Sequence, residues 1–148
     1  MLSYRQIFYH IIFRTRSTQK TLNLNECDDL YKHIKTVIKN KHSVLYCING
    51  TGDHIHFLSD LHPSVALADF VREIKSSAGN WIETNGQFPE FDGWANGYVG
   101  LTYNYTDKER IIDYIKNQRE LHKTINLELE CRKVLEKHGI EIGEDHFL

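Results

Sequence analysis

Two short apolar runs separated by a four-residue turn constrain the fold of this chain more than any other feature. Residues 44–48 and 54–61 are rich in β-branched, aromatic and aliphatic side chains, and Asn49-Gly50-Thr51-Gly52 lies between them. Asparagine and glycine are typical of tight turns, and glycine adopts positive φ angles at little cost. We therefore expect an antiparallel hairpin, in which the second run is a paired strand.

Strand and helix patterns alternate along the rest of the chain. Period-two runs indicate strands, and apolar residues three or four apart indicate helices. Asn25, Ser64 and a capping box over 106–109 are expected to start three of the helices. The expected strands are 4–13, 44–48, 54–61 and 98–105, and the expected helices are 25–40, 64–82, 107–123 and 127–137. This order is a split βαβ pattern, so we predict an α+β, ferredoxin-like antiparallel sheet with additional C-terminal helices.

The composition is typical of one globular domain, which we expect over residues 1–148. Residues 139–148 are expected to form a tail of this domain. The chain is 41% hydrophobic and 26% charged, and its apolar runs are much shorter than a membrane span. Three cysteines without a C-x-x-C pair favour reduced thiols over a disulfide framework. The N-terminus lacks the pattern of a signal peptide, so we expect a soluble cytoplasmic protein. A net charge of −2 excludes a uniformly basic surface but allows a local basic groove.

His54 and His56 are the first candidate site residues. Side chains of a strand alternate between faces, so the two imidazoles point the same way and can share a metal ion. Two ligands leave a cation under-coordinated, so a third must come from elsewhere in the chain. Taken alone, the pair fits better with strand histidines that only form hydrogen bonds, which are the commoner case.

Tyr114 and Gln118 are the second candidate pair. They stand four residues apart on the helix expected over 107–123, and so lie on one face. The amide oxygen of Gln118 would complete a metal site, and the phenol of Tyr114 would be a nucleophile beside it. From spacing alone, the plainer interpretation is that Tyr114 packs in the core and Gln118 faces water.

Several motifs together resemble the single-tyrosine HUH transposases of small bacterial insertion sequences, the IS200-like family, including the relatives associated with repeated extragenic palindromes. The motifs are Gly-Asp-His-Ile-His-Phe-Leu at 52–58, Val-Arg-Glu-Ile-Lys-Ser at 71–76, Trp-Ala-Asn-Gly-Tyr at 94–98 and Tyr-Ile-Lys-Asn-Gln at 114–118. They occur in the expected order, and the resemblance extends from about residue 4 to 139.

The resemblance implies specific roles for four residues. His54, His56 and Gln118 would bind Mg²⁺ or Mn²⁺, and Tyr114 would attack a phosphodiester of single-stranded DNA. The product would be a 5′-phosphotyrosine and a free 3′-OH, from which the strand is rejoined without ATP. It further implies a homodimer that recognises hairpin ends in a bacterial cell, at the nucleoid when bound to DNA. The tyrosine helix of one subunit would complete the site of the same subunit or of its partner.

The resemblance does not fix the roles of several other residues. Many relatives have two histidines soon after the glutamine, whereas here only His122 follows, as a site neighbour or a surface residue. Tyr103, Tyr105 and Trp94 would stack on bases or pack in the core. The residues expected to contact nucleic acid are Arg14, Arg16, Lys20, Lys35, Lys39, Lys75 and Trp94.

Two other functions remain compatible with these residues. One is a domesticated hairpin-binding protein without transposition activity. The other is a ferredoxin-like metal-binding or regulatory module that does not bind nucleic acid.

Overall fold

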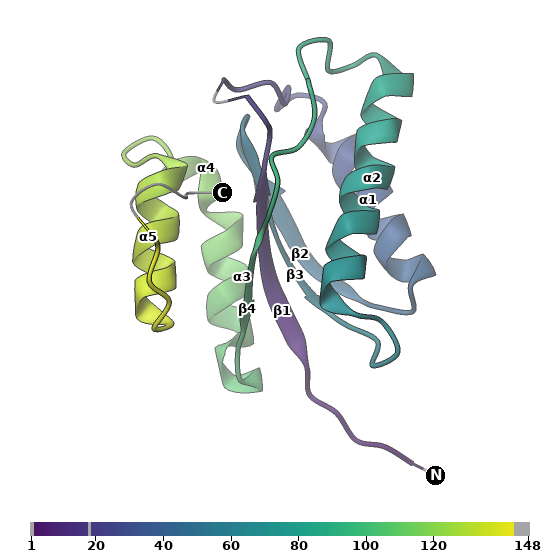
Figure 1. The fold of residues 1–148 in the computed structure, drawn as a ribbon, viewed down its shortest axis with the longest axis vertical. Coiled ribbons are helices and arrows are strands. Elements are labelled where there is room, and N and C mark those ends of the chain that lie inside the picture. The colour runs from purple at the N-terminus through teal and green to yellow at the C-terminus, as the bar shows by residue number, and fades with distance from the viewer. Residues whose placement is uncertain (1, 18, 144–148) are drawn as a thin grey trace.

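The computed structural model describes residues 2–17 and 19–143 and contains one four-stranded antiparallel sheet (Figure 1). Its strands are β1 Phe8–Arg14, β2 Leu45–Gly50, β3 His54–Asp60 and β4 Val99–Thr102, in the order β2-β3-β1-β4. All three strand pairs are antiparallel. The two strands that are central in the sheet, β3 and β1, come from the two halves of the split βαβ pattern. The ferredoxin-like prediction is therefore confirmed.

The helices form a layer on each face of this sheet. The long helices α1 Cys27–Asn40 and α2 Leu67–Asn85 cover one face (Figure 1). The other face carries α3 Lys108–Lys116, the short α4 Gln118–Leu121 and α5 Leu127–Lys137, and a 3-10 turn, η1 Tyr105–Asp107, leads into α3. None of the helices in the described residues combines the length and the apolar character needed to cross a bilayer.

The alternation of side chains along β3 divides the core. Ile55 and Phe57 pack into the main apolar cluster under α1 and α2. Leu58 points to the opposite face and packs with Ile111 and Ile115 of α3. His54 and His56 share that second face, so the histidine pair is directed toward the C-terminal helices, as the sequence pattern predicts.

The turn between β2 and β3 uses its glycines for close approach. A Cβ atom on Gly50 would lie 2.2 Å from the His54 carbonyl oxygen, and one on Gly52 would lie 2.5 Å from Cβ of Lys20. Neither glycine is among those with positive φ, so the expected reason for glycine here is wrong. Glycine is required at 50 because a side chain would collide with the backbone of His54, and at 52 because a side chain would collide with Lys20.

Two strands are shorter than expected. Residues 4–7 have no partner in β3, because the register of the pair ends where Phe8 meets Asp60, and Tyr4 is 88% exposed. β4 ends at Thr102, and Tyr105 begins η1 instead of continuing a strand. The expected strand over 98–105 is therefore too long, and Tyr103 and Tyr105 both lie beyond the end of β4.

The expected helix caps are also replaced. The first residues before α1, α2 and α3 are Glu26, Ala66 and Asp107, and none of these makes a side-chain cap. Ser64 lies 2.6 Å from Nδ1 of His62 through its hydroxyl and stays outside α2. The capping box over 106–109 does not form, because Thr106 and Asp107 lie in η1 and α3 begins only at Lys108. Packing of apolar faces, more than capping, sets where these helices begin.

A candidate metal and nucleophile site

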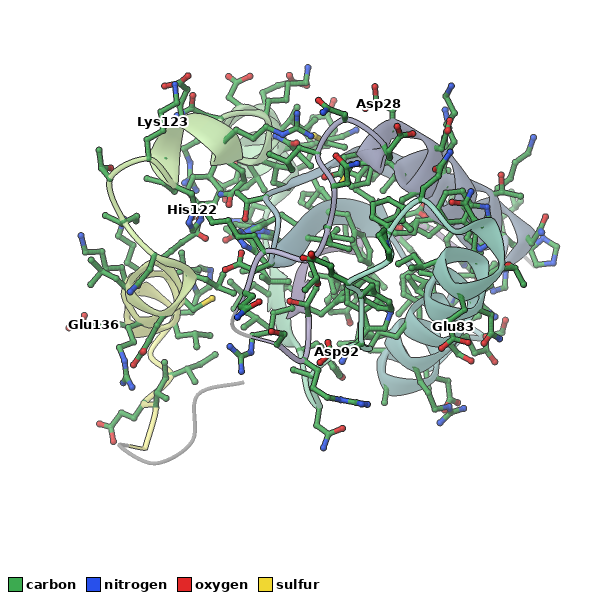
Figure 2. The ribbon with its side chains drawn as sticks, turned by 90° about the horizontal axis from the view of Figure 1, so that it is seen from above. Asp28, Glu83, Asp92, His122, Lys123 and Glu136 are labelled. Carbon is green, nitrogen blue, oxygen red and sulfur yellow. The ribbon has the colours of Figure 1, made fainter. Side chains whose placement is uncertain are left out.

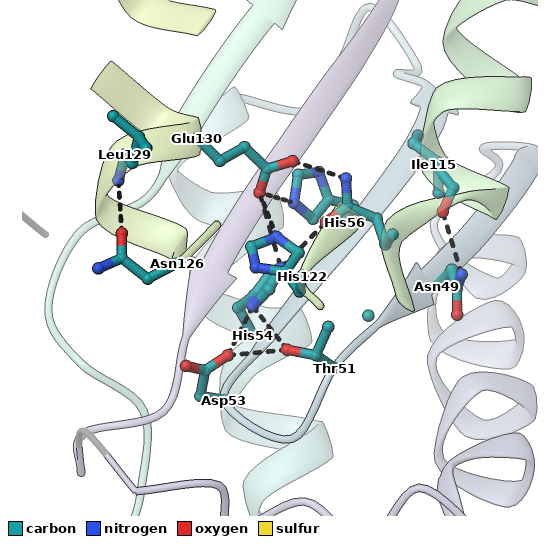
Figure 3. A network of polar contacts seen from close by, with 12 residues as sticks. Asn49, Thr51, Asp53, His54, His56, Ile115, His122, Asn126, Leu129 and Glu130 are labelled. Atoms are coloured by element: carbon teal, nitrogen blue, oxygen red, sulfur yellow. Dashed lines mark hydrogen bonds and ion pairs between the residues drawn. The ribbon is translucent and has the colours of Figure 1, made fainter. Parts of the chain in front are cut away.

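His54 is fixed in orientation by two residues of the β2–β3 turn (Figure 3). Its Nδ1 lies 2.7 Å from Oδ1 of Asp53 and 3.0 Å from the hydroxyl oxygen of Thr51. The Thr51 hydroxyl itself donates to Asp53, at 2.8 Å. A carboxylate only accepts hydrogen bonds, so Nδ1 of His54 carries the proton and Nε2 presents a lone pair to the site. This is the arrangement in which histidines bind metals.

Gln118 reaches the same point from α4. It is fully buried, and its Oε1 lies 3.1 Å from Nε2 of His54. Its Nε2 donates to Oε2 of Glu130 at 2.7 Å, which fixes the orientation of the amide. The amide oxygen of Gln118 and the lone pair of His54 are both acceptors, and two acceptors this close to each other are characteristic of ligands around a cation.

Glu130 of α5 connects all the other site residues. One carboxylate oxygen accepts from His56 Nε2 at 3.2 Å and from His122 Nε2 at 2.8 Å. The other accepts from Gln118 and from the Tyr114 hydroxyl. Burial alone would raise the pKa of Glu130, but the hydrogen bonds it accepts, first from His122 and then from His56, hold that pKa well below its usual range. The carboxylate is therefore an ionised group inside the protein.

His122 belongs to the site and not to the surface. Figure 2 shows its ring directed toward the sheet, while Lys123 lies at the outer edge of the molecule. The exposed fractions of the two side chains, 8% and 68%, agree with this. Ligand atoms of His54, His122 and Glu130 all lie within 4.8 Å of one another. These three residues therefore offer a donor set for a divalent cation.

Tyr114 completes the network from α3. Its half-buried side chain donates a hydrogen bond from the hydroxyl to Oε2 of Glu130. Burial, and next the negative charge of Glu130, raise the pKa of Tyr114 far above its usual value. The phenol is thus neutral and protonated in this state, with its proton directed at a carboxylate.

The helix expected over 107–123 is interrupted between Tyr114 and Gln118. α3 ends at Lys116 and α4 begins at Gln118, with Asn117 between them. The side-chain amide of Asn49 donates to the carbonyls of Ile115 and Lys116, at 3.0 and 3.1 Å. An uninterrupted helix would use those carbonyls for its next turn, so β2 ends the helix. The expectation of one continuous helix is wrong, yet both side chains still reach the site.

Sequence reasoning missed Glu130. The residue carries no motif and has a second glutamate, Glu128, as a near neighbour. One signal was present: Glu130 falls in the apolar stripe of its helix, between Leu127 and Val134, at helical spacing. A carboxylate within an apolar stripe is costly to bury unless it has partners, and so it indicates a site.

A groove next to His122 contains one of the residues expected to bind DNA. Two adjoining hollows, of about 430 and 260 Å³, share Lys20, Thr51, His122 and Lys123 in their walls. Arg119 lines the larger of them. The groove therefore joins cationic side chains to a histidine of the site.

Two arginines at the end of β1 and just beyond it have different surroundings. Arg14 pairs with His54 across the strands, so its half-buried side chain leaves the sheet on the face of the site. Arg16 donates its backbone N–H to the carbonyl of Gly93 at 2.8 Å and is exposed. Only Arg14 is therefore directed toward the metal and nucleophile site.

The other expected DNA contacts lie away from the site. Lys75 donates to the carbonyl of Ala95, and the indole of Trp94 donates to the carbonyl of Lys75 at 2.9 Å. Trp94 also packs edge-on against Phe13, with ring centroids 4.8 Å apart. These contacts hold the loop that precedes β4. Lys35 and Lys39 stand on α1, across the sheet from the site (Figure 1).

Burial of His56 should make the free energy of unfolding depend on pH in the acidic range. Burial, opposed by Glu130, lowers the pKa of His56 from 6.5 to about 4. Because the folded state resists protonation, stability is complete above about pH 6.5 and falls as the pH drops toward 4. We expect the free energy of unfolding to fall by about 2 kcal/mol between pH 7 and pH 5, by linkage of this shift.

Denaturant titrations in the presence of a chelator would measure this loss. His56→Gln, which removes the titrating ring, should show a smaller difference between the two pH values than the wild type. His62→Gln, outside the site, should match the wild type. An equal pH difference in His56→Gln and the wild type would contradict the assignment.

Comparisons with known proteins agree on one family. A sequence model of the family described as "Transposase IS200 like" matches residues 3–118. No curated protein matches the chain. Among solved structures, the fold is similar to a candidate transposase from Deinococcus radiodurans, with a TM-score of 0.60, 22% identity, and coverage of 80% of this chain and 95% of that one. It is also similar to a REP-associated tyrosine transposase bound to a REP hairpin, with a TM-score of 0.61, 17% identity, and coverage of 84% and 76%. Because the family match covers most of its length, this chain belongs to the IS200-like transposase family.

Proposed function

We propose that this transposase binds hairpin ends and cleaves and rejoins single-stranded DNA through a 5′-phosphotyrosine at Tyr114, with the help of a divalent metal. The observation that carries the proposal is one network, in which the Tyr114 hydroxyl and the Gln118 amide meet at Glu130 and the Gln118 oxygen contacts Nε2 of His54. A nucleophile and a set of cation ligands in direct contact are the parts that phosphoryl transfer needs.

The residues present fit Mg²⁺ or Mn²⁺. His54, His56 and Gln118 would hold the ion, and Glu130 adds a carboxylate, the ligand type that both ions prefer, with His122 within reach of the same point. His56 would bind through Nε2 once the proton that this atom donates to Glu130 is lost. The facing acceptors of His54 and Gln118, 3.1 Å apart, support this donor set. When bound, the cation would polarise the phosphate and stabilise negative charge on the leaving oxygen.

Tyr114 and Glu130 can support a transesterification at phosphorus, in which the bond that forms replaces the bond that breaks. The hydroxyl oxygen of Tyr114 forms a bond to phosphorus, and the bond from phosphorus to the 3′-oxygen breaks. The phenol proton is hydrogen-bonded to Glu130, and this carboxylate would relay it, directly or through water, to the departing 3′-oxygen, which leaves as a free 3′-OH. Attack of a 3′-OH on the phosphotyrosine reverses these steps and rejoins a strand.

A homodimer is the assembly we propose, with the tyrosine helix acting within one subunit or exchanged between two. In the single chain, Tyr114 and Gln118 already contact Glu130. An exchanged helix would therefore form the same contacts with the partner's α5. Heterodimers that combine Tyr114→Phe in one subunit with His56→Ala in the other distinguish the two arrangements. Attachment of the His56→Ala subunit to DNA would indicate an exchanged helix, and no attachment of either subunit would indicate action within one subunit.

The groove beside His122 should supply much of the affinity for DNA. Lys20→Ala is expected to weaken binding of single-stranded DNA and to reduce the slope of log K against log salt by about 0.7, the value for one phosphate contact on a single strand. Lys39→Ala removes a lysine from α1, on the other face of the sheet, and serves as the matched control. Filter binding over a range of salt concentrations measures both slopes. Equal effects of the two substitutions would place the DNA elsewhere.

A gel assay tests the function as a whole. Single-stranded DNA from both flanks of the gene is incubated with the protein and Mn²⁺ or Mg²⁺, and a covalent protein–DNA species is sought after denaturation. We expect this species with metal and not with chelator. Retention of hairpins without any covalent species would favour a domesticated hairpin-binding protein. Metal uptake without DNA retention at low salt would favour a metal-binding module.

A further inference from the structure

A cavity of about 510 Å³ opens on the side of Tyr114 away from the groove. Its walls come from β1, from the segment after β4, from α3 and from the end of α5. Tyr114 lines this cavity and His122 lines the groove, and the two hollows have no lining residue in common. Glu130 contacts both Tyr114 and His122. A strand that lies in the groove and crosses the site would therefore reach the cavity next.

His10 brings an unused polar atom to the cavity wall. The residue is 1% exposed, and its Nε2 lies 2.8 Å from Nδ1 of His56. Its other ring nitrogen, Nδ1, is buried and has no hydrogen-bond partner among the described residues. A buried polar atom without a partner is uncommon, and a ligand in the cavity would supply one. Because Nε2 of His56 donates to Glu130, Nδ1 of His56 accepts from Nε2 of His10, and Nδ1 of His10 is therefore an acceptor. The N–H groups on the edge of a base can donate to it.

The remaining walls combine an aromatic ring with positive charge. The half-buried ring of Tyr103 lies between His10 and His138, with centroid distances of 6.3 and 5.2 Å. Arg110 and Lys137 stand at the exposed rim. Asp107 also lines the cavity, 3.4 Å from the Arg110 guanidinium, so the rim keeps a net positive charge. An aromatic face inside and cations outside are the features that bind an unpaired nucleotide.

We propose that this cavity is the subsite for the nucleotide adjacent to the bond that Tyr114 cleaves. The base lies against Tyr103 and reaches Nδ1 of His10, and its phosphate lies at the rim near Arg110 and Lys137. The volume is within the range of small-molecule sites. The placement relative to the cleaved bond rests on the proposed function, but binding of a nucleotide by the cavity does not.

NMR titration of the whole chain, labelled at the histidine rings, tests the subsite. The four 2′-deoxynucleoside 5′-monophosphates are added separately, with inorganic phosphate as a further probe. We expect at least one nucleotide to shift the ring resonances of His10. Arg110→Ala and Lys137→Ala should each weaken that nucleotide about two- to fivefold, as for exposed ion pairs. Lys133→Ala, on the same helix but outside the cavity wall, should leave the affinity unchanged.

Three results would overturn the subsite: no shift of His10 with any nucleotide, the same response to phosphate alone, or equal weakening by Lys133→Ala. The covalent gel assay is read independently of this titration. If the covalent species forms and His10 does not respond, the subsite is wrong and the transposase proposal stands. If His10 responds and no covalent species forms, the cavity binds nucleotides and the proposed cleavage is wrong.

Discussion

Replacing Tyr114 by phenylalanine should abolish covalent attachment to single-stranded DNA and leave hairpin binding intact. The substitution removes the nucleophilic oxygen and keeps the ring, which packs beside Ile111 and Ile115. Loss of a nucleophile commonly reduces such a reaction by at least about a thousandfold. The covalent species on a denaturing gel and the affinity for the hairpin are measured on the same preparation.

A second tyrosine provides the control for this result. Tyr105 is 69% exposed and begins η1, outside the network of Glu130. Tyr105→Phe should attach to DNA as the wild type does. If Tyr114→Phe still formed a covalent species that Tyr105→Phe lost, the nucleophile would have been assigned to the wrong residue.

Replacing Glu130 by glutamine should weaken Mn²⁺ binding at least about tenfold, in the range found when groups supporting a metal site are removed. The amide keeps the size of the side chain but removes the negative charge. It also places an NH₂ group in a site where the Nε2 of Gln118 can only donate. Calorimetric titration of the folded protein with Mn²⁺ gives the affinity without requiring DNA.

Glu128 provides the matched control on the same helix. It lies near the start of α5 and pairs with Arg132 at the surface, at 3.0 Å. Glu128→Gln should bind Mn²⁺ like the wild type, because its charge is screened by water. Unchanged affinity in Glu130→Gln would mean that Glu130 only positions Tyr114 and Gln118 and is not a ligand.

The fold was predictable because its signals are local. The turn between β2 and β3, the alternation that places His54 and His56 on one face, and the apolar stripes of α1 and α2 all lie within single elements. The residues at which strands and helices begin and end were less predictable, because these positions depend on partners far along the chain. β1 begins where its register with β3 begins, at Phe8 opposite Asp60. The break at Asn117 depends on Asn49, whose amide occupies the carbonyls of the helix end.

The site was predictable only in part, for the same physical reason. The motifs indicated His54, His56, Tyr114 and Gln118, and the structure brings all four side chains to one buried network. Glu130 joins them only when α5 packs on the sheet through Leu127 and Cys131. That docking is a tertiary interaction, and no spacing within the helix specifies its partner.

The position of Glu130 along the chain has a further consequence for the family. The match to the IS200-like family ends at Gln118, and Glu130 lies beyond it, on a helix joined to α4 by a short connection. The site is thus assembled from a segment shared with the family and a carboxylate carried outside it. A chimera that exchanges α5 would keep Tyr114, Gln118 and both histidines and replace the helix that carries the acid. If the proposed function holds, metal preference would therefore respond to exchange of a terminal helix, while the proposed nucleophile and histidine ligands stay the same.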